Sequence, residues 1–287
     1  MIERLAWVSA REARGQDEDE PLALEALTAA GVTVEIADWH DPDVDWGRFD
    51  RAVLRSPWDY PQRMPEFLAW LDRVAARTEL VNPPEMVRWS LSKEYLADLA
   101  DAGIPITPTE FVRPGSPAPV RFPEGSFVVK PAVGAGSRDA ASYHADQHDA
   151  ARAHVERLRA AGQVVLVQPF LESIAADGEW PLVFFAGELS HAASKRVALP
   201  HASTIDELFA AETNTHHEPT AEQAAVAQAA VDLVAARFGT PAYARVDLVR
   251  DNSGRLCVME VELVEPSLFL PYGGPEAAQR LAAALVR

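Results

Sequence analysis

Alternating apolar and polar residues divide the first part of the chain into short strands and amphipathic helices. Apolar runs bounded by polar turns predict buried strands at residues 5–9, 32–36 and 51–55. Apolar residues recur at helical spacing over 22–30 and 65–78, and Gly31 follows the first segment as a typical helix-ending residue. Because strands and helices alternate, we expect parallel strands joined by crossover helices. Residues 1–85 are therefore predicted to form a parallel-sheet α/β lobe.

A change of pattern after two consecutive prolines marks a second unit, predicted over residues 86–172. Its first element is expected to be one helix over 90–103, with Ser90 as the N-cap and Gly103 at the end. A proline-rich connector follows, and then a strand, a helix and a strand are expected at 126–130, 148–161 and 164–168. We expect these elements to form a second small α/β lobe.

The last unit, predicted over residues 173–287, consists mostly of strands. We expect a hairpin, an alanine-rich helix and a terminal helix at 178–188, 221–238 and 275–286. Residues 243–266 are the most informative segment, because two apolar strands there flank the turn sequence Asp-Asn-Ser-Gly at 251–254. The chain is thus predicted to end in a β-hairpin followed by a helix.

Three acids interrupt the apolar strands of this last hairpin. Glu260 and Glu262 are two residues apart and point to one face, and the hairpin can bring Asp247 opposite them. Like charges that face each other across strands are destabilising, so such a cluster indicates a bound cation. Magnesium is the favoured ion because it prefers carboxylate oxygens. Arg245 adds a positive charge to the same face, and a metal beside an arginine is suited to handling phosphate.

Composition and charge narrow the functions of such a site. The chain has 287 residues and a formal net charge of −17, which opposes binding to nucleic acids and anionic membranes. A small polyanion such as ATP would need a locally basic, metal-assisted site. Cys257 is the only cysteine, and the sequence has no apolar run of signal-peptide or membrane-spanning length. We therefore expect a cytoplasmic enzyme.

Two segments carry residue types that suit a nucleotide, although each has a simpler structural explanation. Lys130 ends an apolar strand just before the glycine loop 131–138, where it can reach phosphate; a surface lysine before a turn fits equally well. Gln168-Pro-Phe-Leu171 follows another apolar strand, and its proline leaves backbone groups free to bond a planar heterocycle. Phe170 and Leu171 would contact the faces of that ring. The same four residues can also simply end an edge strand.

Charged residues around the 178–188 hairpin complete the candidate nucleotide contacts. Glu179 can accept hydrogen bonds from ribose hydroxyls, whereas the simpler explanation is an exposed glutamate at a strand end. Lys195 and Arg196 lie beyond the hairpin, where a basic loop can close over phosphate, although such charge pairs are usually only solvated.

The sequence Arg55-Ser-Pro-Trp-Asp-Tyr60 follows a strand of the first lobe, where open α/β sheets bind ligands. Arg55 can pair with a substrate carboxylate, with Trp58 and Tyr60 as walls of the pocket. The alternative is a loop whose aromatic rings pack the interface between lobes.

In their order along the chain, these motifs resemble the ATP-grasp superfamily over about residues 85–270, in its glutathione synthetase and D-alanine ligase branch. The loop at 55–60 and the sequence Glu-Val-Glu-Leu-Val-Glu-Pro at 260–266 resemble D-cycloserine-forming cyclo-ligases, which close O-ureidoserine. The resemblance implies an α/β fold of the ATP-grasp type. Its N-terminal parallel-sheet lobe would be followed by two α+β subdomains, 86–172 and 173–287, that clamp ATP.

The resemblance also implies a role for each candidate residue. Lys93, expected in a helix, and Lys130 would contact the phosphates of ATP. The other predicted contacts are Gly134, Gly136 and Ser137 over the phosphates, Gln168, Phe170 and Leu171 at adenine, Glu179 at ribose, and Lys195 with Arg196 at the γ-phosphate.

At the reaction centre, Asp247, Glu260 and Glu262 would hold Mg²⁺, with Mn²⁺ as a substitute, and Arg245 would stabilise the acyl phosphate. Superfamily members commonly carry asparagine where Glu262 stands, so direct ligation by Glu262 is less certain than by Glu260. No catalytic base is assigned.

The implied activity is a Mg-ATP-dependent carboxylate–amine ligase that acts through an acyl phosphate and releases ADP and phosphate. Its partners would be a small-molecule carboxylate and amine, either as one molecule that cyclises or as two that are joined, and a homodimer is the default assembly. A non-catalytic nucleotide-binding protein is the alternative from another class.

Overall fold

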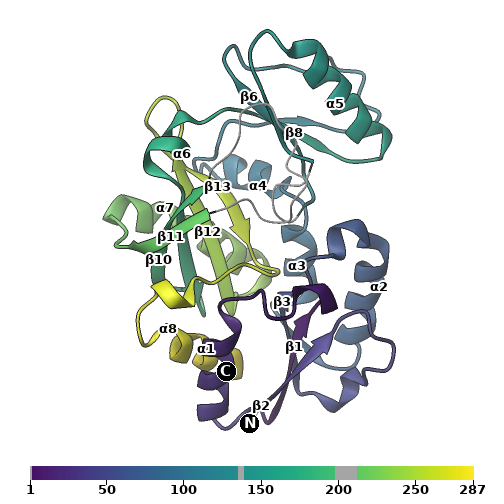
Figure 1. Cartoon of the computed structure of the whole chain (residues 1–287), viewed down its shortest axis with the longest axis vertical. Helices are drawn as coiled ribbons and strands as arrows, with labels where there is room; N and C mark the ends of the chain where they lie inside the picture. The colour runs from purple at the N-terminus through teal and green to yellow at the C-terminus, as the bar shows by residue number, and fades with distance from the viewer. Residues whose placement is uncertain (1, 135–138, 198–211) are drawn as a thin grey trace.

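The computed structural model describes residues 2–134, 139–197 and 212–287, whose strands form three separate sheets (Figure 1). Figure 1 shows the second of these sheets at one end of the molecule and the first at the other. The predicted segments 1–85, 86–172 and 173–287 contain one sheet each. The boundaries of the domains themselves stay predictions.

The first sheet is parallel, as the alternation of strands and helices predicts. Its strands lie in the order β2-β1-β3-β4, namely Thr33–Asp38, Arg4–Ser9, Arg51–Ser56 and Glu79–Val81. The longer helices of this lobe are α1 (Glu20–Ala29) and α2 (Met64–Ala75), and short 3-10 turns occupy 11–13, 46–48 and 60–62. The core between α2 and the sheet is rich in aromatic rings, with Phe67 stacked against Trp70 and Tyr60. The predicted strands and helices of this lobe are confirmed, and β4 is a further strand that the sequence pattern did not predict.

The second sheet is antiparallel, so this unit is α+β in character. Its order is β5-β8-β6-β7, namely Glu110–Val112, Val165–Pro169, Phe127–Pro131 and Ala141–Tyr143. Helix α5 (His148–Ala160) covers one face, where its apolar residues pack against Phe127 and Val167. The strand and helix pattern predicted an α/β lobe, and this prediction is wrong because the strands run antiparallel. The α+β subdomain implied by the resemblance is confirmed.

The third sheet contains five antiparallel strands. Its order is β11-β10-β9-β12-β13, namely Glu212–His217, Glu188–Val197, Trp180–Phe185, Tyr243–Arg250 and Leu256–Glu262. Helix α6 (Glu172–Asp177) precedes it, and α7 (Ala221–Phe238) packs on one face after a capping box formed by Thr220 and Gln223. Ala186 and Gly187 both have positive φ, as the tight turn of the first hairpin requires.

The single helix predicted over 90–103 is wrong. The chain forms α3 (Pro84–Ser90) and α4 (Tyr95–Asp101), and Lys93 lies in the turn between them. Ser90 is therefore the last residue of α3 and not an N-cap. Its hydroxyl accepts a hydrogen bond from the Leu263 amide at 3.2 Å, while the Lys93 amide donates to the carbonyl of Ala132 at 2.8 Å. These contacts with distant segments offset the loss of helical hydrogen bonds.

The C-terminal helix α8 (Ala277–Val286) returns to lie beside α1, as Figure 1 shows, after a 3-10 turn at 270–272. Apolar residues of β1, β9 and α8 share one core, among them Trp7, Val183 and Leu281. The first and third units therefore pack against each other through buried side chains. Within the described residues, no helix is both long and apolar enough to cross a bilayer.

Candidate active site

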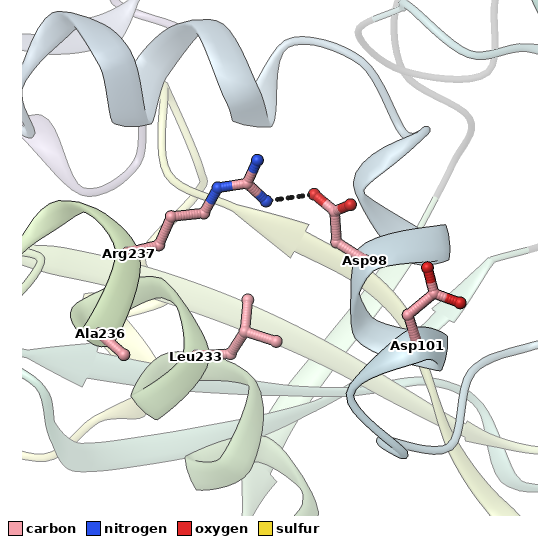
Figure 2. A pocket seen from close by; sticks show the side chains of 5 residues that line it. All are labelled: Asp98, Asp101, Leu233, Ala236 and Arg237. Atoms are coloured by element: carbon pink, nitrogen blue, oxygen red, sulfur yellow. Dashed lines mark hydrogen bonds and ion pairs between the residues drawn. The ribbon is translucent and has the colours of Figure 1, made fainter.

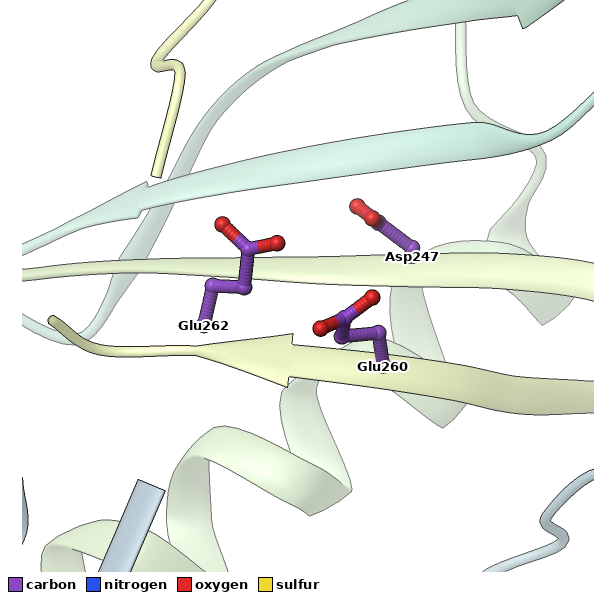
Figure 3. Close-up of side chains that lie close together, drawn as sticks. All are labelled: Asp247, Glu260 and Glu262. Atoms are coloured by element: carbon purple, nitrogen blue, oxygen red, sulfur yellow. The ribbon is translucent and has the colours of Figure 1, made fainter. Parts of the chain in front are cut away.

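Three carboxylates converge on one face of the β12–β13 hairpin, as Figure 3 shows. Oxygen atoms of Asp247, Glu260 and Glu262 all lie within 4.8 Å of one another. The strand register places Asp247 opposite Glu260 and Arg245 opposite Glu262. The predicted convergence of the acids is confirmed, and their binding of a metal stays a prediction.

The alternation of side chains along β12 explains why the acids gather there. Ala244, Val246 and Leu248 point to the other face, where they are buried together with apolar residues of α7. The residues between them, Arg245 and Asp247, must therefore point away from α7. One face of the sheet builds the core while the other presents charge.

Arg245 neutralises part of this acidic face. Its guanidinium donates to both carboxylate oxygens of Asp247, at 2.8 and 2.9 Å, and to Glu262 at 2.7 Å. A further hydrogen bond reaches the carbonyl of Ser267 at 3.1 Å. Burial alone would lower the pKa of Arg245, but Asp247 and Glu262 outweigh it and hold the pKa well above its ordinary value. Arg245 is thus a fixed positive charge.

The two glutamates differ in their electrostatic environment. Burial would raise the pKa of Glu260, but Lys93 and Lys130 outweigh it and lower the pKa to about 2. Burial raises the pKa of Glu262 to about 7 although Arg245 opposes this, and the charge of Glu260 adds to the rise. Glu260 is therefore a carboxylate throughout the neutral range, as a metal ligand requires, whereas the raised pKa of Glu262 shows that the cluster disfavours a further negative charge at that position.

The chain contains three lysines, and all three lie close to these acids. The Lys93 ammonium contacts Glu260 at 2.7 Å and the carbonyl of Gly134 at 3.3 Å. Lys195 on β10 lies 3.3 Å from Glu179. Burial lowers the pKa of Lys130 on β6, and the charge of Lys93 acts in the same direction. No hydrogen bond or ion pair joins the Lys130 side chain to another described residue, so its ammonium is available to a ligand.

The predicted adenine segment follows β8 and is largely committed to internal contacts. Gln168 is buried, and its amide donates to the Thr109 hydroxyl at 2.8 Å. The Phe170 amide donates to Ser126 at 2.8 Å, and the Phe170 carbonyl accepts from Asn252 at 2.9 Å. The side chain of Leu171 is buried against Val249 and Cys257. A nucleotide contact of these residues stays a prediction, and the backbone of Phe170 is less free than expected.

Glu179 is 6% exposed, which excludes the simpler explanation of a solvated glutamate at a strand end. Its backbone pairs with that of Lys195, so β10 places the two side chains together. The structure also describes Gly134, whereas the predicted phosphate contacts Gly136 and Ser137 lie outside the described residues.

The segment 55–60 lies between lobes. Arg55 is only 1% exposed, and its guanidinium lies 3.6 Å from Asp19 and donates to the Pro266 carbonyl at 2.7 Å. The side chains of Trp58 and Tyr60 are also buried. These contacts favour the alternative, a loop that packs the interface, over direct pairing of Arg55 with a substrate carboxylate.

Comparison with known proteins identifies the family. A family model described as D-cycloserine synthetase DcsG, N-terminal domain, matches residues 5–82. Over 285 residues the chain is 42% identical to the cycloserine biosynthesis protein DcsG of Streptomyces lavendulae, which covers 94% of this chain and 93% of that protein. The chain belongs to the DcsG family.

Solved structures agree with this assignment. A crystal structure of D-cycloserine synthetase DcsG has a TM-score of 0.88 and 39% identity and covers 98% of both chains. The ATP-grasp ligase PsnB with a minimal precursor shares the fold at a TM-score of 0.64 and 18% identity over 100% of this chain and 99% of that one. D-alanine–D-alanine ligase from Bacillus anthracis also shares the fold, at a TM-score of 0.68 and 16% identity. The match covers 99% of this chain and 96% of that one. The predicted fold and enzyme class are confirmed: the chain is an ATP-dependent C–N ligase of the ATP-grasp type.

Sequence reasoning overlooked two signals of the DcsG-family site. Lysine is rare in this arginine-rich chain, and its three positions all lie close to the acidic cluster. Glu265 follows Glu262 by three residues, and its carboxylate accepts a hydrogen bond from the Tyr60 hydroxyl. Burial raises the pKa of Glu265 to about 8, with the charge of Glu262 acting in the same direction.

A surface pocket of about 350 Å³ lies elsewhere, between α4 and α7, as Figure 2 shows. It is lined by Asp98, Asp101, Leu233, Ala236 and Arg237, and an ion pair joins Arg237 to Asp98. None of the candidate site residues lines it. Because α7 packs on the face of the sheet opposite the acids, this pocket is separate from the active site.

Proposed function

We propose that the chain closes O-ureidoserine to cycloserine in a reaction driven by Mg-ATP. The observation that carries the proposal is its 42% identity to DcsG of Streptomyces lavendulae along 94% of the chain. The cluster of three acids, three lysines and Arg245 supports the ATP-dependent part of this activity. O-Ureidoserine contains both a carboxylate and a nitrogen nucleophile, so a single substrate suffices. Attack of the ureido nitrogen on the acyl phosphate closes the ring and releases phosphate, and hydrolysis of the carbamoyl group on that nitrogen to carbon dioxide and ammonia leaves cycloserine.

The residues present fit magnesium. Asp247, Glu260 and Glu262 offer only carboxylate oxygens, the ligands that Mg²⁺ prefers, and Mn²⁺ accepts the same set. When bound, Mg-ATP supplies the phosphoryl group that activates the substrate carboxylate. Although Arg245 already bonds both Asp247 oxygens, each oxygen retains a lone pair for a cation. We assign Asp247 and Glu260 as ligands and Glu262 as a further, less certain one.

The cations of the site would control charge during the reaction. Lys93, Lys130 and Lys195 hold phosphate oxygens, and Arg245 neutralises negative charge at the activated carboxyl group. Closure of loops over the site would exclude water, which would otherwise hydrolyse the acyl phosphate before the nitrogen attacks. We further propose that the enzyme is a cytoplasmic homodimer without a nucleic-acid partner.

The proposal is tested by incubating the purified chain with O-ureidoserine, ATP and Mg²⁺. We expect equal amounts of ADP, phosphate and cycloserine, measured by coupled assay and mass spectrometry. Phosphate release that requires a second amine would instead identify a ligase that joins two molecules. ATP binding without substrate-dependent release would identify a nucleotide-binding protein.

Lys130→Ala is expected to raise the KM for ATP by roughly 10- to 100-fold, since a charge-assisted hydrogen bond to phosphate contributes about 1.5–3 kcal/mol. ATP titration of phosphate release measures this change, and nucleotide binding by calorimetry supports it. Arg113→Ala is the matched control, because Arg113 is an exposed cation beside β5 whose ion pair among the described residues is with Glu94. An unchanged affinity for ATP in Lys130→Ala would refute the phosphate contact.

A further inference from the structure

Glu265 is a carboxylate close to the acidic cluster of Asp247, Glu260 and Glu262, and the described residues supply no cation that pairs with it. It follows the end of β13, and its side chain is partly accessible. Among the described residues, no lysine, arginine or histidine forms an ion pair with it. The other acids of the site are already paired: Asp247 with Arg245, Glu260 with Lys93 and Glu179 with Lys195.

The segment that carries Glu265 is held in place residue by residue. Side chains from β3, β10, β12 and the end of β4 bond its carbonyl groups. The contacts are Asn82 to Leu263 at 2.8 Å, Tyr243 to Val264 at 2.9 Å, Arg55 to Pro266 at 2.7 Å, Arg245 to Ser267 at 3.1 Å and His191 to Leu268 at 2.7 Å. Asp19 also accepts hydrogen bonds from the amides of Leu268 and Leu270. The backbone around Glu265 is thereby fixed.

Tyr60 fixes the Glu265 side chain as well. Its hydroxyl, on a residue that is 4% exposed, donates to the carboxylate from the N-terminal lobe. A carboxylate has about four acceptor positions, so one hydrogen bond leaves most of its capacity unused. The charged groups that influence Glu265 most are Glu262, Lys93 and Glu260, which places its carboxylate on the side of the reaction centre.

An amino-acid substrate would bring the cation that Glu265 lacks among the described residues. An amino-acid substrate has an α-ammonium group in addition to the carboxylate that reacts. We propose that Glu265, positioned by Tyr60, binds the α-ammonium group of the amino-acid substrate. This inference rests on the proposed function, because it assumes an amino acid whose carboxylate is activated near Arg245. Glu265 and the three acids would then together select substrates that carry both an ammonium and a carboxylate group.

Paired substrates with and without the amine test this role. O-Ureidoserine is compared with its deamino analogue, 3-(ureidooxy)propionate, in ATP-dependent phosphate release. Glu265→Gln keeps the volume of the side chain and its contact with Tyr60 but cannot carry the negative charge that a bound ammonium group would stabilise. We expect it to raise the KM for O-ureidoserine by roughly 10- to 100-fold, as loss of a charge-assisted contact does, with the KM for ATP unchanged.

The deamino analogue separates binding of the amine from a merely structural effect. The wild type should use it poorly, and Glu265→Gln should use it as well as the wild type does. Equal losses on both substrates would overturn the inference. Tyr60→Phe keeps the stacked ring and should raise the KM for O-ureidoserine by only about 2- to 10-fold, as loss of a neutral donor does. If Glu265→Gln does not fold, the amine dependence of Tyr60→Phe decides the question.

Failure of the proposed function gives a different result. If the wild type releases no phosphate with O-ureidoserine, that substrate is wrong, and the same comparison is made with the amino acid that does support release. A wild-type enzyme that uses its substrate and the deamino analogue equally well would overturn the role of Glu265 and leave the ligase activity intact.

Discussion

Glu260→Gln is expected to abolish turnover while the protein remains folded. Glu260 is the acid whose pKa is lowered to about 2, so it provides a full negative charge to a cation at neutral pH. Glutamine preserves its volume but removes that charge. We expect kcat/KM to fall by more than about 100-fold, because loss of an outer-shell partner of a metal ligand already costs up to that factor. Phosphate release at a series of Mg²⁺ concentrations measures the loss.

Asp247→Asn should have a similar effect, since the two residues face each other across the hairpin. Glu276→Gln is the matched control, because the side chain of that glutamate is 84% exposed and its ion pair within the described part of the chain is with Arg280. It should keep full activity and the wild-type dependence on Mg²⁺. Full activity in both Glu260→Gln and Asp247→Asn would show that the acids do not hold the metal.

The acidic hairpin could be predicted because its geometry is local. Side chains alternate along a strand and a tight turn sets the register, so Asp247 and Glu260 meet whatever the rest of the fold does. The same holds for Lys130, which ends a strand that its own apolar pattern defines. Local periodicity therefore identified the charged face and the nearby lysine.

The break at Lys93 could not be predicted in this way. Residues 90–103 have the composition of one helix, and nothing nearby in the sequence opposes it. The turn forms because the Lys93 amide donates a hydrogen bond to the Ala132 carbonyl and the Lys93 ammonium pairs with Glu260 on β13 of the third sheet. Tertiary contacts thus override helix propensity where the site needs the lysine.

The supports of Glu265 were missed for a similar reason. Arg55 and Pro266 lie 211 positions apart in the chain, and Asp19 and Leu270 lie 251 apart. The short motif at 55–60 predicted a ligand for Arg55, whereas burial gives it a neighbouring carbonyl and Asp19 instead. These contacts depend on how the first lobe packs against the hairpin. The sequence alone therefore could not show which residues of the first lobe face the reaction centre.

Arg245→Gln is expected to cost both activity and stability. The guanidinium is buried and pairs with Asp247 and Glu262, so its removal leaves the buried carboxylate of Asp247 and the partly buried carboxylate of Glu262 without their partner. Breaking a buried pair in this way typically costs about 3–5 kcal/mol. We expect the free energy of unfolding, measured with urea in the absence of metal, to fall by about that amount. Arg250→Gln is the control on the same strand, because Arg250 pairs at the surface with Glu222.

Magnesium should restore much of this lost stability, since a bound cation replaces the missing charge beside Asp247 and Glu262. Mg²⁺ is therefore expected to raise the melting temperature of Arg245→Gln more than that of the wild type. The pH dependence has a definite sign. Burial already raises the pKa of Glu262 from 4.5 to about 7, so the stability of the metal-free protein falls as the pH rises from the ordinary pKa of the group to its pKa in the folded protein. That fall should be steeper in Arg245→Gln. A melting temperature that responds to neither Mg²⁺ nor pH would contradict the view that Arg245 and a metal ion share the neutralisation of one acidic cluster.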